Sequence, residues 1–273
     1  MGTSCQFSLL KYVPKSFLSV LFPKILLLFW GIGIMSFGQK QVSDQQLTWN
    51  TYMFAVSFPK QWGAQFETGE RFFWQPMRQY QTYIRTNVNY MFPNSTWGAM
   101  VGGAWFLQSA NSPHLANYIS ISELRPYFGF TNKQPLKYFN IEQRYQVESR
   151  FFQNTNADKT ALASGFHFGN FRFRYRLQFL IPILKLEHNR ELRLRTGTEI
   201  FFNVGKNIVY NVFDQSRVFT AFQFRFSPKF TIELGYLNSF QQTPAGKTFY
   251  QRHFWLLNLI FNFTITKPKA NSI

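Results

Sequence analysis

The chain has little cysteine and little acid. Cys5 is the only cysteine, and 12 Asp and Glu stand against 29 Lys and Arg in 273 residues, a formal net charge of +17. A single cysteine excludes a disulfide framework and a thiolate metal site. No segment after Gln39 is apolar over the roughly 20 residues that a transmembrane helix needs, and none has a helical period. The sequence therefore predicts neither a disulfide-rich scaffold nor a helical membrane protein.

Residues 1–38 have the pattern of a secretory signal peptide. Three lysines precede an apolar stretch at 25–37, and Ser36 and Gly38 supply small residues before a polar segment. This stretch of 13 residues is too short to span a bilayer as a helix, which argues against an anchor. Cleavage after Gly38 would remove Cys5 and leave 26 basic residues, so we expect an exported, cysteine-free and basic mature chain.

Aromatic residues, in contrast, are abundant, with 35 Phe, 13 Tyr and 7 Trp. A soluble core of this size has difficulty burying 55 rings, whereas a lipid-facing wall has no such limit. Residues 171–179 alternate without a break: five large apolar residues share one face of a strand, and three arginines and a glutamine share the other. This pattern favours a strand with one face in lipid.

Alternation of this kind recurs along the chain. The candidate strands are 47–58, 62–74, 80–92, 96–108, 118–131, 137–153, 165–182, 191–205, 215–227, 229–240 and 250–263. Short connections with proline at 59, 93 and 228 alternate with longer ones near 109–117, 154–164, 206–214 and 241–249, as in bacterial outer-membrane barrels.

The predicted fold is therefore all-β: a single transmembrane antiparallel up-and-down β-barrel. The pattern gives eleven strands, but barrels of this class have an even number. We therefore expect about 12 strands, with ten as the alternative. The predicted barrel covers 39–263, and 264–273 form a short polar C-terminal tail.

The arginines predict which face points inward. Thirteen of the 15 lie on polar strand faces, whereas the 14 lysines lie in the signal, turns, strand ends, loops or tail. Arginine on a lipid-facing surface costs about 2–4 kcal/mol near the midplane, so the polar faces should line the lumen. The predicted lumen-lining residues are Arg144, Arg150, Arg172, Arg174, Arg176, Arg193, Arg195, Arg217, Arg225, Glu142, Glu148, Glu199 and Glu233. These charges favour either a plug of ion pairs or a weakly anion-selective path.

Strict alternation also places Glu70 on the apolar face beside Phe66 and Phe72. A bulge near Gly69, or a position beyond the hydrocarbon, would explain this exception.

The last strand ends in a pattern that resembles the C-terminal insertion signal of outer-membrane barrels. Its alternating apolar residues are Trp255, Leu257, Leu259, Phe261 and Phe263. We therefore expect the barrel insertion machinery of the outer membrane as a partner.

Six short motifs resemble, in order, a bacterial outer-membrane barrel family catalogued as domain of unknown function 2490. They are Glu123-Leu124-Arg125-Pro126-Tyr127, Glu142-Gln143-Arg144, Phe171-Arg172-Phe173-Arg174-Tyr175-Arg176, Glu199-Ile200-Phe201-Phe202-Asn203, Phe213-Asp214-Gln215-Ser216-Arg217 and Glu233-Leu234-Gly235-Tyr236. The resemblance covers roughly 44–263 and implies the fold and an outer-membrane location. It implies no activity and no catalytic residues.

The residues that carry chemistry do not form a recognisable active site. The four histidines lack ligand spacing, so we expect no metal and no cofactor. Ser164 with His167 is the one pair with which a lipid- or lipopolysaccharide-processing enzyme remains an alternative. A cell-surface interaction or envelope-assembly protein is a third class. The expected surroundings are outer-membrane lipid and lipopolysaccharide, not nucleic acid, and the sequence does not predict an oligomeric state.

Overall fold

Apolar and polar residues alternate along the strands of a closed barrel. A computed structural model describes residues 40–115, 119–158 and 160–266, which all fall in one compact unit. The strands are β1 (Gln41–Ser57), β2 (Trp62–Phe73), β3 (Arg78–Met91), β4 (Trp97–Gln108), β5 (Ile121–Pro135), β6 (Asn140–Thr155), β7 (Leu162–Lys185), β8 (Glu191–Val204), β9 (Phe213–Ser227), β10 (Phe230–Gln242) and β11 (Thr248–Thr264). None of the described residues forms a helix long and apolar enough to cross a membrane.

The predicted all-β barrel is confirmed, and the described residues contain eleven strands, close to the expected twelve. Consecutive strands pair antiparallel, but β1 and β11 close the barrel in parallel, with Gln41 opposite Thr248 and Ser57 opposite Thr264. The requirement for an even number of strands holds only where the closing pair is also antiparallel. The parallel closure therefore accounts for the odd count.

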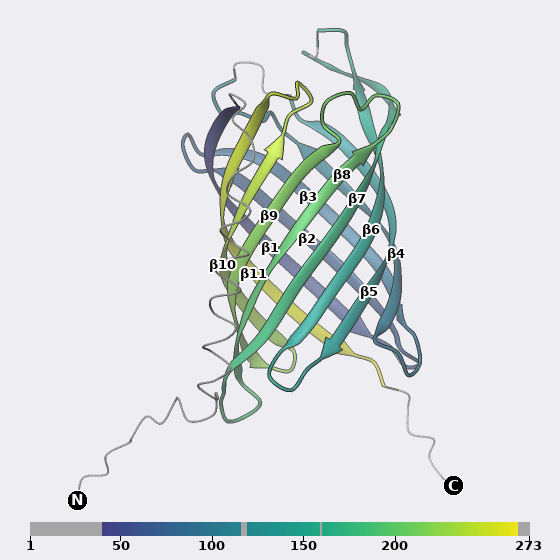
Figure 1. Cartoon of the computed structure of the whole chain (residues 1–273), viewed down its shortest axis with the longest axis vertical. Helices are drawn as coiled ribbons and strands as arrows, with labels where there is room; N and C mark the ends of the chain where they lie inside the picture. The colour runs from purple at the N-terminus through teal and green to yellow at the C-terminus, as the bar shows by residue number, and fades with distance from the viewer. Residues whose placement is uncertain (1–39, 116–118, 159, 267–273) are drawn as a thin grey trace, which may run out of the picture. The chain divides into compact units, whose positions relative to one another are not determined.

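The two rims of the barrel differ (Figure 1). One rim carries the short connections 58–61, 92–96, 136–139, 186–190 and 228–229. The opposite rim carries 74–77, 109–120, 156–161, 205–212 and 243–247, which include the longest connections of the barrel. Because the closing pair is parallel, β1 begins at this long-loop rim and β11 ends at the short-turn rim.

The outward face of the wall is apolar and rich in aromatic residues. Phe173 is 46% exposed, whereas its neighbour Arg174 is 8% exposed. Exposed tryptophans mark both ends of the wall: Trp62 and Trp97 begin strands at the short-turn rim, and Trp74 follows β2 at the long-loop rim. Glu70 is exposed on the outward face, and the nearby register shift lies between Arg71 and Phe72, two residues beyond the expected bulge.

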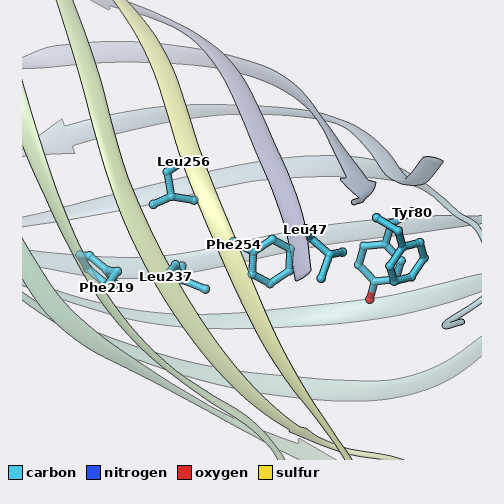
Figure 2. Packing of buried hydrophobic residues seen from close by; sticks show 7 residues of the cluster. Leu47, Tyr80, Phe219, Leu237, Phe254 and Leu256 are labelled. Atoms are coloured by element: carbon cyan, nitrogen blue, oxygen red, sulfur yellow. The ribbon is translucent and has the colours of Figure 1, made fainter. Parts of the chain in front are cut away.

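The interior also contains an apolar strip, which sequence alternation does not predict. It consists of Leu47, Phe73, Tyr80, Phe219, Leu237, Phe254 and Leu256, each at most 6% exposed. Figure 2 shows these side chains following one another across neighbouring strands. Because the last strand is apolar on both faces, Phe254 and Leu256 point inward while Trp255 and Leu257 point outward. One side of the lumen is therefore packed by hydrocarbon.

The predicted signal peptide lies outside the described residues. In the predicted tail, Thr264 completes β11, residues 265 and 266 have no regular structure, and the remainder lies outside the described residues.

Candidate functional site

The lumen contains a continuous network of ion pairs, whose members lie on the five consecutive strands β5 to β9. It joins four acids to six arginines through N···O distances of at most 4.0 Å. Its members are Glu123, Glu148, Glu199, Asp214, Arg125, Arg144, Arg150, Arg172, Arg174 and Arg217. Because the planar guanidinium presents donors along several edges, each arginine can hold carboxylates on two strands. The network therefore fastens neighbouring strands together from inside.

Glu199 on β8 pairs with three arginines of this network, as does Glu148 on β6. Its carboxylate accepts from Arg174 Nε at 2.7 Å and from Arg144 Nη2 at 2.9 Å, and Arg217 Nη1 lies 3.5 Å away. These arginines come from β7, β6 and β9, so one buried carboxylate compensates charge from three strands. A neutral group at this position would leave three buried cations with reduced compensation.

Glu233 on β10 is also buried, and it forms a cluster that shares no described ion pair with this network. Arg195 donates to both of its carboxylate oxygens at 2.6 Å from Nε and Nη2, in the bidentate geometry that guanidinium favours. Gln223 Nε2 donates to the same carboxylate at 2.7 Å, and Asn258 also donates to it. This carboxylate therefore accepts hydrogen bonds from three strands, β8, β9 and β11.

Side chains divide the lumen into two cavities. The loop-side cavity, about 650 Å³, is bordered by residues of the long-loop rim such as Asn111 and Asn207. The turn-side cavity, about 360 Å³, is bordered by residues near the short turns such as Asn262. Arg85, Arg174 and Arg217 line both cavities and lie between them. We call these three side chains the arginine septum.

Trp49 of β1 packs beside the septum. Its Nε1 donates to Tyr83 Oη at 2.9 Å, and the guanidinium carbon of Arg71 lies 3.6 Å from the centroid of its ring. The guanidinium carbon of Arg217 lies 5.6 Å from the same ring, although it comes from β9. Only glycine at position 69 admits Tyr83 here, since a Cβ would lie 2.7 Å from the Tyr83 hydroxyl oxygen. Aromatic packing therefore narrows the lumen at this level.

The structure places the predicted lumen residues as follows. Arg150 and Arg172 line the loop-side cavity; Arg174 and Arg217 line both; Glu142, Arg144, Arg176, Arg193, Arg195, Glu199 and Glu233 line the turn-side cavity. Glu148 is buried in the ion-pair network, and Arg225 pairs at 3.0 Å with Glu191, at the short-turn end of β8. The predicted insertion-signal residues lie on the outward-facing parity of β11.

Two members of the site are not apparent from the sequence. Asp214 has the parity of outward residues on β9, but a register shift opposite Phe201 and Phe202 turns it inward, where it pairs with Arg172 at 2.8 Å. Trp49 alternates with polar residues as an ordinary inward side chain does, and nothing in the pattern shows that it reaches β9. Bulges and contacts across the lumen decide these two positions.

The histidines occupy separate places. His167 Nδ1 lies 2.8 Å from Asn154 Oδ1, so Asn154 is the hydrogen-bond partner of the His167 ring among the described residues. Asn154 Nδ2 donates in turn to the Ser164 carbonyl at 2.8 Å. On the outer wall, His253 Nε2 lies 3.0 Å from Asp44 Oδ2, and its Nδ1 contacts the Tyr236 hydroxyl. Within the described ranges, no group of three His, Cys, Asp or Glu side chains is arranged to hold a metal ion.

Comparison with known proteins identifies a family but no activity. A model of the family described as "Protein of unknown function (DUF2490)" matches residues 46–250, which span most of the barrel from β1 to the start of β11. No curated protein and no solved structure matches the chain. The matched region contains the whole ion-pair network and the arginine septum. The chain therefore belongs to the DUF2490 family, and its described residues form a closed eleven-stranded barrel with buried Arg and Glu ion pairs in its lumen.

Proposed function

We propose that the protein is an outer-membrane β-barrel, exported by its N-terminal signal peptide, whose lumen is plugged by side chains and does not serve as a diffusion pore. The observation that carries this proposal is the arginine septum, because the same three side chains border both cavities. A solute crossing the barrel must displace Arg174 and Arg217 from the buried carboxylate of Glu199.

The outward face supports the membrane location. Phenylalanines such as Phe128, Phe173 and Phe222 are each about half exposed, which is costly in water and favourable in hydrocarbon. Exposed tryptophans near both rims match the aromatic girdles of membrane barrels. The partners that follow are outer-membrane lipid, lipopolysaccharide and the barrel insertion machinery, which would recognise the end of β11.

Weak anion selectivity is the second candidate. The ion-pair network has six arginines for four acids, so the lumen carries an excess of positive charge. If thermal motion opens the septum, anions will pass in preference to cations.

Planar-bilayer recording of the purified protein distinguishes the two candidates. We expect no steady conductance from the natural protein, and a measurable conductance when Arg174 and Arg217 are both changed to alanine. Arg225→Ala is the matched control, because this arginine lies outside the septum and should leave the bilayer silent. Steady, anion-selective current through the natural protein would contradict the plug and favour the pore.

The location is tested by fractionation. We expect the protein in the outer-membrane fraction as a folded form that changes its mobility on a gel when heated. Recovery of folded protein from the soluble fraction would contradict the membrane proposal.

A further inference from the structure

The loop-side cavity has a strong excess of positive charge. Eight arginines line it, whereas Glu123 and Asp214 are the acids among its described lining residues. The turn-side cavity is closer to balance, with seven arginines and four glutamates. The uncompensated charge of the lumen is therefore concentrated at the end that carries the long loops.

Arg252, which also lines this cavity, is buried and has no acid partner among the described residues. It is 2% exposed, and its guanidinium donates to three amide oxygens: Gln45 Oε1 at 2.8 Å, Gln241 Oε1 at 2.5 Å and Asn111 Oδ1 at 3.2 Å. Amides orient the guanidinium but do not neutralise it. Asn111 belongs to the longest connection, so this cation lies near the mouth of the cavity.

Arg71, deeper in the same cavity, has still fewer partners. It is 6% exposed and stacks on Trp49, and its Nε has no hydrogen-bond partner in the described part of the chain. No described carboxylate lies within 4.0 Å of its guanidinium nitrogens. Burying a cation without a counter-charge is unfavourable, so this position gains most from an anion.

Arg71 and Arg217 contact the same indole ring from β2 and β9, at 3.6 and 5.6 Å. The Nε of Arg217 likewise has no described partner. Both arginines line the loop-side cavity, whereas Trp49 lines the turn-side cavity. Two guanidinium groups, each with an unpartnered Nε, therefore meet beside Trp49 at the inner end of the loop-side cavity. Guanidinium forks are suited to bidentate binding of phosphate oxygens.

We propose that the loop-side cavity binds a phosphate or a small phosphate-bearing molecule, with Arg71 and Arg217 at its inner end and Arg252 nearer its mouth. A volume of about 650 Å³ lies within the usual range for small-molecule sites. This inference rests on the proposed function, because the septum closes the inner end of the cavity and makes it a chamber open toward the long loops.

Isothermal titration calorimetry of the full mature chain in detergent at low ionic strength tests the proposal, with inorganic phosphate and dihexanoyl phosphatidic acid as separate probes. We expect inorganic phosphate to bind with a stoichiometry of one, more weakly as the salt concentration rises. Arg71→Met should weaken binding about tenfold or more, as expected for the loss of a charge-assisted hydrogen bond. Arg193→Met, in the turn-side cavity, is the control that should leave the affinity unchanged.

Each result has a defined meaning. Equal losses in both variants would overturn the inference. So would the absence of binding of either probe at millimolar concentration, or lipid binding that Arg71→Met leaves unchanged. Should Arg71→Met fail to give a heat-modifiable folded form, Arg71→Lys keeps the charge and removes the fork, and it should also weaken binding; unchanged affinity in that variant would overturn the proposal. Bilayer recording of the same preparations separates the two proposals. A silent bilayer without phosphate binding would reject the phosphate site and leave the plugged barrel standing.

Discussion

Changing Glu199 to glutamine is the most direct test of the buried network. The substitution keeps the shape of the side chain but removes the charge that compensates Arg144, Arg174 and Arg217 at 2.9, 2.7 and 3.5 Å. Breaking a buried ion pair by neutralising one partner costs about 3–5 kcal/mol. With a urea dependence of about 2 kcal/mol per molar, the unfolding midpoint should fall by about 1.5–2.5 M.

Glu191→Gln is the matched control. Glu191 also pairs with two arginines, Arg225 at 3.0 Å and Arg193 at 3.6 Å, but those side chains are 34% and 25% exposed. Because these arginines reach solvent, the Glu191 pairs should contribute close to the roughly 0–1 kcal/mol of exposed pairs, and the control should change the midpoint by less than Glu199→Gln does.

The assay is urea unfolding of each protein refolded in detergent micelles, followed by tryptophan fluorescence and by the heat-sensitive shift on a gel. The two probes should report one transition, so that the free energies of unfolding of the variants can be compared. If Glu199→Gln loses no more stability than Glu191→Gln, the ion pairs of Glu199 are screened as strongly as ion pairs in water. The proposal that side chains plug the lumen would then be wrong.

Three other predictions concern the wall and its closure. Phe173→Arg should reduce insertion into vesicles, since an outward arginine costs about 2–4 kcal/mol at mid-depth, whereas Phe173→Leu should insert normally; equal insertion of both would place this face away from lipid. Cysteines at Asn50 and Leu257, which are register partners in the β1–β11 pair, should form an intramolecular disulfide under mild oxidation, whereas cysteines at Asn50 and Phe261 should not; the reverse result would disprove the register. Epitope tags placed before β1 and in loop 109–120 should react with antibody on the same side of the membrane, and a tag after β11 on the other; labelling of both chain ends from one side would contradict the parallel closure.

The sequence by itself determined the fold class and the orientation of most side chains. A residue in a strand faces the side opposite to its neighbours, so the run from Phe171 to Phe179 decides locally which residues share a face. Placing arginine on a lipid-facing wall is so costly that the choice between the two faces also follows from composition. For this reason the alternation predicted that Phe173 faces outward and that Arg174 and Glu199 face inward.

Only the tertiary structure decided how the barrel closes and what lies across its lumen. The direction in which β1 meets β11 depends on residues more than 200 positions apart, and no local period encodes it. A bulge of one residue reverses the parity that prediction relies on, as at Asp214. The contacts of Trp49 with Arg71 and Arg217 depend on the diameter of the closed barrel. Strand faces are set by neighbours in the chain, whereas the septum and the unpaired arginines are set by neighbours in space.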